Sequence, residues 1–205
     1  MEKINKELKD MKYKKTIVAL LGIVMSANLN AQATKTNLNI EKEIIINASI
    51  EKSWQVLGPE YADAYKWASS VSHSEGKGSG INGATCSSRG CETSIGKLHE
   101  KLLKYSEEDH QIIYEVDGMP KMVKYASNNW KLFDLGNGKT KLKIDLKVKV
   151  GGFFGFLMKP MMKMKMSKIA KQTVEEFKYY VENGLPHPRK VKAINKLTKK
   201  SSKRW

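Results

Sequence analysis

Residues 141–150 (KLKIDLKVKV) have the most regular hydrophobic pattern in the chain. An aliphatic residue alternates with a charged residue throughout, so one face of the segment is apolar and the other is polar. This alternation predicts a strand in an antiparallel sheet with one buried face. Less regular runs, bounded by turn residues such as Asn137-Gly138, predict further strands. These runs cover residues 37–48, 84–92, 97–105, 111–118 and 122–133.

The hydrophobic spacing changes to three or four residues in the C-terminal part of the chain. It predicts one long amphipathic helix over about 156–183. Pro160 is expected near the start of this helix, where a missing N–H costs little. Two short helical segments, 50–57 and 60–71, are predicted after the first strand, followed by a glycine-rich loop at 75–83.

This order of elements defines the fold class as α+β. An antiparallel sheet with one apolar face needs a second layer to cover it, and the single long helix is the element that can do so. The space between sheet and helix is then either a packed core or a cavity.

The N-terminal residues 1–33 have the pattern of a secretory signal peptide. A basic segment that begins at Met11, a possible true start, is followed by the apolar residues 16–27 and by the small residues Ala31 and Ala33. The apolar stretch is shorter than the about 20 residues that span a bilayer. We therefore expect cleavage near Ala33 and a mature chain that is periplasmic or secreted. A buried N-terminal helix is the alternative interpretation.

The formal net charge of +16 is concentrated at the C-terminus. The last seventeen residues contain eight Lys or Arg and no acidic residue, which predicts a basic disordered tail over 189–205. A solubilising tail is the simplest interpretation, and attraction to an anionic membrane surface or polysaccharide is the next. An exported chain rarely meets nucleic acid, so no nucleic-acid partner is expected.

The two cysteines do not indicate a metal site, because Cys86 and Cys91 have no second pair of ligands nearby. A disulfide is compatible with export, but one extended strand would place their Cα atoms roughly 16 Å apart. A bridge would therefore require a turn within 87–90. The sequence also lacks the motifs of hydrolases, metalloproteases and nucleotide-binding proteins, and no cofactor is expected.

Several local motifs occur in an order that resembles the START-like (SRPBCC) superfamily, in particular its polyketide cyclase/dehydrase-like branch. The motifs are IIINASIEKSWQVL, Trp67, Gly83, Arg89-x-Cys91, Gly96-x-x-x-Glu100, Tyr114-x-Val116-x-Gly118, Asn137-Gly-Lys-Thr140 and EEFKYYVENG. The resemblance extends over about 38–188, within a predicted domain of 34–188. It implies a helix-grip (START/Bet v 1-like) fold, in which a curved antiparallel sheet packs on the long C-terminal helix around a cavity. Members of the superfamily bind lipids or other hydrophobic small molecules, a minority are cyclases or dehydratases, and no catalytic motif is common to all.

The inner face of the predicted sheet contains the candidate polar anchors. Glu100 has the strand parity of Leu98 and Leu102, and Arg89 on the neighbouring strand is its expected partner. This pair is either a structural ion pair or an anchor for the polar group of a ligand; in an enzyme, Glu100 would be the acid or base. Trp67 can be core or a binding platform.

The methionines of the long helix have three interpretations: packed core, the lining of a cavity, or a membrane-surface patch together with Phe153, Phe154 and Phe156. We predict an exported binding protein for a hydrophobic small molecule or lipid. The alternatives are a cyclase or dehydratase that uses the same cavity, and a surface-binding protein that acts through its basic tail. The predicted ligand-binding residues are Trp67, Arg89, Glu100, Tyr114, Asn128, Trp130, Met158, Met162 and Met166.

Overall fold

The computed structural model describes residues 36–93 and 95–202. They lie in one compact unit, Lys35–Trp205. Its strands are β1 (Thr36–Ile46), β2 (Val71–Lys77), β3 (Ser88–Thr93), β4 (Gly96–Ser106), β5 (Gln111–Asp117), β6 (Val123–Asp134) and β7 (Thr140–Val150). Its helices are α2 (Ile50–Leu57), the 3-10 helix η1 (Tyr61–Lys66), α3 (Gly152–Asn183) and α4 (Pro188–Ser202).

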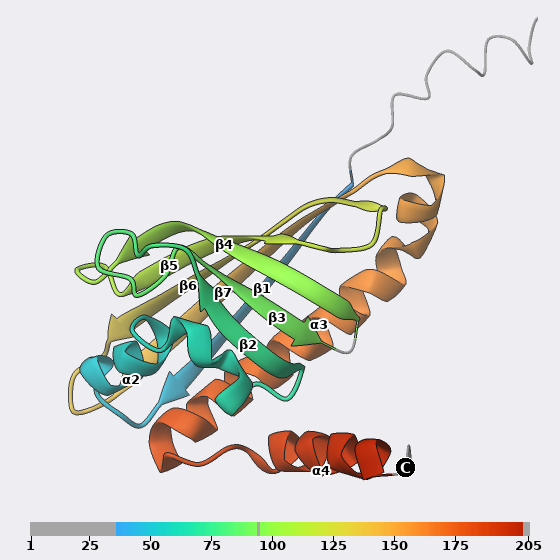
Figure 1. Ribbon diagram of the computed structural model, residues 1–205. Helices are drawn as coiled ribbons and strands as arrows, with labels where there is room; N and C mark the ends of the chain where they lie inside the picture. Colours follow the sequence, from blue (N-terminus) through green and yellow to red (C-terminus); the bar gives the residue numbers. More distant parts are fainter. Residues whose placement is uncertain (1–35, 94, 203–205) are drawn as a thin grey trace, which may run out of the picture. The chain divides into compact units, whose positions relative to one another are not determined.

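The strands form one antiparallel sheet in the order β1-β7-β6-β5-β4-β3-β2. Figure 1 shows the sheet curving over α3, with α2 and η1 at one end. This arrangement confirms the predicted α+β helix-grip fold. The alternation in β7 has the expected effect, because Leu142, Ile144, Val148 and Val150 are buried while Lys147 and Lys149 are exposed.

Helix α3 begins four residues before the predicted position, so Pro160 lies inside it rather than at its start. Gly152 allows the abrupt turn from β7 into the helix, because its φ of +78° lies in the left-handed region that favours glycine. In the C-terminal half of α3, Phe177 is fully buried and packs edge-on against Trp67 and Trp130. This half of the helix therefore belongs to a packed aromatic core.

The strand β2 was not predicted, and this part of the prediction was wrong in two ways. The helical segment expected over 60–71 ends at Lys66, and the first residues of the expected loop, Glu75–Lys77, belong to β2. Ser74 explains part of the difference, because its hydroxyl donates to Ala62 O and accepts from the Tyr65 N–H, so β2 is fixed against η1 by side-chain bonds. The strand expected from residue 84 begins only at Ser88.

The prediction of a disordered tail is also wrong, since residues 188–202 form the helix α4. Two of its basic residues contact the domain. The Arg189 guanidinium binds Glu176, which is 1% exposed, and Glu175. The buried Lys190 ammonium donates to the carbonyl of Val71 at 2.7 Å. These contacts order the start of the segment despite its charge.

The predicted signal peptide, residues 1–33, lies outside the described residues. Within 36–202, with the gap at 94, the structure contains no helix that is both long and apolar enough to cross a membrane.

Candidate ligand-binding site

The register of the sheet places an apolar floor and a charged pair in one row across its inner face. Leu38 of β1 pairs with Val148 of β7, and Val148 pairs with Ala126 of β6. Val116 of β5 packs against the cluster that contains Ala126 and Val148, and it pairs with Glu100 of β4, which pairs with Arg89 of β3. Because directly opposed residues share a face, an apolar surface leads into a polar group.

The Arg89 guanidinium forms an ion pair with the Glu100 carboxylate, as predicted from strand parity. The side chains of the pair are only 10% and 12% exposed, respectively. Arg89 also donates to the backbone carbonyl of Tyr61 and lies 4.2 Å from the centre of the Tyr61 ring. The Tyr61 hydroxyl in turn donates to the Glu100 carbonyl at 3.3 Å. Tyr61 of η1 therefore contacts both residues of the pair.

Tyr114 and Asn128 form a second polar group next to this pair. The Tyr114 hydroxyl accepts hydrogen bonds from Asn128 Nδ2 at 3.1 Å and from Trp130 Nε1 at 3.2 Å. Neither bond uses the hydroxyl's own proton. Asn128 Oδ1 is buried and has no hydrogen-bond partner among the described residues. The group therefore offers one donor and one acceptor inside the domain.

The methionines of α3 face this row from the opposite side. Met162 and Met166 pack against the cluster of Leu38, Ala126, Val148 and Val150. They remain half-buried, as do Met158, Val116 and Leu146, the last two of which pack against the same cluster. This contrasts with the fully buried Phe177 at the other end of α3. The sheet–helix contact is therefore less shielded from solvent at the N-terminal half of the helix than at its C-terminal half.

Burial shapes the electrostatics of the polar groups. Burial and the nearby Glu100 charge raise the pKa of Tyr114, and burial is also the main cause of the raised pKa of Tyr61. Burial acts to lower the pKa of Arg89, but Glu100, Tyr61 and Tyr114 counteract it and the net direction is upward. The phenols therefore stay neutral and the guanidinium stays charged at neutral pH.

Burial raises the pKa of the Cys91 thiol to about 11, and the Glu100 charge acts in the same direction. Because the pKa of this thiol is higher in the folded than in the unfolded chain, it stabilises the folded state at any pH below the unfolded pKa. That stabilisation is lost as the pH rises through about 11.

At pH 8, Cys91 in the folded protein should react with iodoacetamide at least about 100-fold more slowly than in urea, because only the thiolate reacts. Trypsin cleavage after Arg89 separates the Cys86 and Cys91 peptides for mass spectrometry. Equal labelling rates in the folded and unfolded protein would contradict this prediction.

The structure brings most of the predicted residues together, but not all. Arg89, Glu100, Tyr114, Asn128 and Trp130 are linked by hydrogen bonds or strand pairing, and Met162 and Met166 lie over the same row. Trp67 instead lies in the aromatic core. Met158 is half-buried and is not among the methionines that pack against this part of the sheet.

Sequence reasoning missed Tyr61, Cys91, Val116 and Leu146 as members of the site. The parity that selected Glu100 extends to Val116 and Leu146 through the adjacent strands, so pairing the strands in register would have found these two. Cys91 and Leu98 are paired in the same way on β3 and β4. Tyr61 is contributed by a helix, and strand parity gives no information about it.

The cysteines are free and both are buried. Ser88–Thr93 is a strand, so the turn that a disulfide would need within 87–90 is not formed. The described residues contain no group of three or more His, Cys, Asp or Glu side chains that could hold a metal ion.

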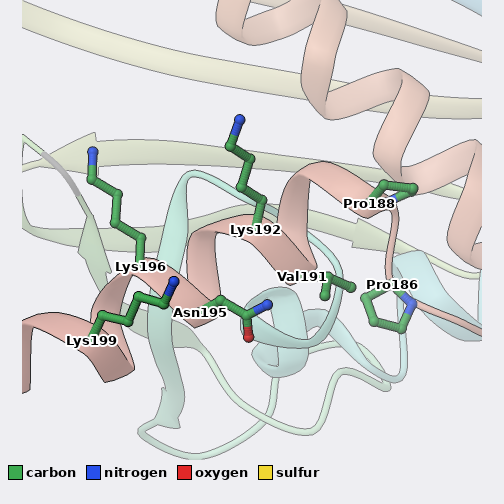
Figure 2. Close-up of a pocket in the computed structure, with 7 residues that line it drawn as sticks. All are labelled: Pro186, Pro188, Val191, Lys192, Asn195, Lys196 and Lys199. Atoms are coloured by element: carbon green, nitrogen blue, oxygen red, sulfur yellow. The ribbon is translucent and has the colours of Figure 1, made fainter. Parts of the chain in front are cut away.

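A separate groove runs along α4, and none of the predicted ligand-binding residues lines it. Figure 2 shows the side chains of Lys192 and Lys196 extending outward from the helix beside it. The groove is lined by Pro186, Pro188, Val191, Lys192, Asn195, Lys196 and Lys199.

A helix-grip fold with a polar group inside an otherwise apolar sheet–helix space defines a class of ligand-binding domain. The sequence model of the family described as polyketide cyclase / dehydrase and lipid transport matches residues 37–182. The chain belongs to this family, whose fold in general binds hydrophobic small molecules. No curated protein matches the chain by sequence.

Solved structures show the same fold at low sequence identity. A START superfamily protein from Mycobacterium smegmatis is 16% identical, with a TM-score of 0.57 over 70% of this chain and 97% of that one. Norcoclaurine synthase from Thalictrum flavum is 15% identical, with a TM-score of 0.59 over 74% and 98%. The Zhui aromatase/cyclase from Streptomyces sp. R1128 is 12% identical, with a TM-score of 0.58 over 74% and 100%. Identities at this level establish the fold alone.

Proposed function

We propose that this protein is an exported carrier that holds a hydrophobic small molecule or lipid between the inner face of its sheet and the N-terminal half of α3. The observation that carries the proposal is the row in which the apolar floor of Leu38, Val148, Ala126 and Val116 meets the Glu100–Arg89 pair. Such a row matches a ligand with a long apolar body and one polar end.

The opposite wall supports the same assignment. Methionine side chains are flexible and polarisable, so they adapt to apolar ligands of irregular shape. Met162 and Met166 are half-buried although they face the sheet, so this part of the interior is not closed by tight packing. Each Å² of apolar ligand surface buried here would contribute about 25 cal/mol.

The polar end of the ligand would be oriented by Asn128 and Tyr114. Asn128 Oδ1 can accept a hydrogen bond from a ligand hydroxyl or amine, since it has no partner within the described part of the chain. The unused Tyr114 proton can donate to a ligand oxygen. A buried acceptor left without a partner costs about 1–3 kcal/mol, so a ligand that satisfies Asn128 gains affinity.

The proposal of export depends on residues 11–33, where a basic segment, an apolar segment and two small residues follow one another. Cleavage near Ala33 would leave a mature chain that begins close to the first described strand, β1 (Thr36–Ile46). The whole family match, 37–182, would be retained.

Mass spectrometry of the protein, purified from the export compartment without detergent, tests both parts of the proposal. The intact mass should correspond to a chain that begins near Thr34. Solvent extraction should release a lipid or apolar metabolite in about equimolar amount. Replacing Met162 and Met166 by tryptophan should weaken ligand binding by about 10- to 100-fold, because the larger side chains would occupy the space proposed for the ligand, and each tenfold loss corresponds to about 1.4 kcal/mol.

Met164→Trp is the matched control, since Met164 lies on the same helix but is 68% exposed. Its binding should equal that of the wild type. If no molecule is extracted, and if a fluorescent fatty-acid analogue binds neither the wild type nor the control, the methionines are ordinary core and the carrier proposal is wrong. An uncleaved chain would remove the export part alone.

A further inference from the structure

The first turns of α3 expose an apolar face that the sheet–helix packing does not use. The exposed fractions are 76% for Phe153, 70% for Phe154, and 61% for both Phe156 and Leu157. Successive helix residues are offset by about 100°, so these four side chains span about 160° of the helix surface. The centre of that arc lies opposite Gly155, which is buried against Val150. The arc therefore faces away from the domain.

The same face continues beyond Pro160. Met164, which is 68% exposed, falls on the centre of the arc, while Met162 and Met166 fall on the opposite side, toward the sheet. This half of α3 thus has two apolar faces, and only the inner one is covered by the domain. We call Phe153, Phe154, Phe156, Leu157 and Met164 the outer face.

Positive charge surrounds the outer face. Between Asp145 and Glu175 the sequence contains seven lysines and no acidic residue. Lys163 and Lys165 lie on either side of Met164 along the helix, and both are exposed. Strand β6 contributes another lysine near this face, because the Lys124 side chain lies against Gly151, the residue before α3. In the described part of the chain, no carboxylate forms an ion pair with Lys124, Lys163 or Lys165.

We propose that the outer face docks the protein on a lipid bilayer that contains anionic phospholipids. Phenylalanine and leucine side chains insert at the level of the headgroups, and lysines beside them bind lipid phosphates. A second copy of the chain fits less well as the occupant, because two such faces would bring unbalanced lysines together, and lysine is depleted at protein interfaces. The docking surface lies on the helix whose inner face borders the ligand site, but docking itself does not require the site to hold a ligand.

Vesicle flotation tests this proposal. The protein used is chain 35–205, the compact unit that contains every described element and the whole family match, so that the apolar residues 16–27 do not contribute. Phosphatidylcholine vesicles that contain phosphatidylglycerol should bind it at least about tenfold more tightly than pure phosphatidylcholine vesicles. The preference should weaken between about 0.1 M and about 1 M salt, because screening shortens the range of the lysine charges.

Two triple substitutions locate the surface. Phe153→Ser/Phe154→Ser/Phe156→Ser should reduce binding at least about tenfold, because the apolar area available for insertion is lost. Leu103→Ser/Leu135→Ser/Leu185→Ser removes three apolar side chains elsewhere that are 47–62% exposed, and it should bind like the wild type. Circular dichroism and thermal unfolding should show that both variants fold.

A second pair of variants tests whether binding depends on the lysines beside the outer face or on the positive charge of the whole protein. Lys163→Gln/Lys165→Gln/Lys168→Gln should lose the preference for anionic vesicles, whereas Lys52→Gln/Lys101→Gln/Lys139→Gln should keep it; all six lysines are exposed. Wild-type binding by the folded phenylalanine variant would overturn the proposal. So would a phenylalanine-dependent dimer in size-exclusion chromatography with light scattering, without vesicle binding, because the outer face would then serve self-association.

Discussion

Replacing Glu100 by alanine is expected to lower the free energy of unfolding by about 3–5 kcal/mol. The Arg89 side chain is 10% exposed, and its charge is balanced in the interior by the Glu100 carboxylate. Without that carboxylate, the guanidinium retains its bond to the Tyr61 carbonyl but has no counter-charge. A buried charge without a partner is among the most costly defects in a folded protein. Urea unfolding followed by tryptophan fluorescence measures the change.

The double variant Arg89→Met/Glu100→Leu distinguishes this explanation from a general loss of packing. Removing both charges and keeping the volume is expected to cost much less than Glu100→Ala, because a buried ion pair gains little over well-packed apolar residues. If the double variant is as unstable as the single one, the loss arises from packing and not from the orphaned charge. Ligand binding by a stable double variant would then show whether the pair also acts as an anchor.

Replacing Glu176 by alanine is the second large expected effect, with a loss of about 3 kcal/mol in the free energy of unfolding. Glu176 is 1% exposed and accepts hydrogen bonds from the Ser69 N–H at 2.8 Å and from the Ser69 hydroxyl at 2.7 Å. Hydrogen bonds to a charged group contribute about 1.5–3 kcal/mol each, and the substitution removes two of them. It also removes the Arg189 contact at 2.8 Å, which joins α4 to α3.

Limited proteolysis gives a local measurement of the same substitution. Cleavage after the lysines of α4 (Pro188–Ser202) should become faster before the rest of the domain is degraded, because the helix loses a contact at its first turn. Glu175→Ala is the matched control: the Glu175 side chain is 31% exposed and binds the other side of Arg189, so its loss should cost less than about 1 kcal/mol. Equal proteolysis of the two variants would show that Glu176 does not hold α4.

The sequence predicted the sheet well where the two faces of a strand have different environments. Strand β7 separates aliphatic from charged residues at every position, so its hydrophobic pattern reports its burial directly. The β2 segment (VSHSEGK) has almost no such contrast, and only Val71 and Ser74 are buried in it. It is a strand because β3 and η1 hold it, and those contacts are not local in sequence.

The error at the C-terminus has the same physical origin. Composition indicated a solvated basic segment, but two acidic residues on α3 and a carbonyl at Val71 bind its first basic residues. Charge composition alone does not show which charges find partners after folding. At the site, parity correctly paired Arg89 with Glu100, because both lie on adjacent strands. Trp67 follows a 3-10 helix, and only the three-dimensional packing shows that it contacts Phe177.

The pairing of β1 with β7 has a consequence for how the chain acquires its structure. Thr36 pairs with Val150 and Ile46 with Thr140, so the two strands are separated by roughly 100 residues. The other neighbours in the sheet are consecutive along the chain and can form hairpins early. Strand β1 has no partner until β7 has been synthesised. Because their pairing closes a long loop, we expect it to be the slow step of folding. The sheet therefore cannot be completed before Val150 has been synthesised, and until then β1 and the exposed edge of the partly formed sheet both lack a partner.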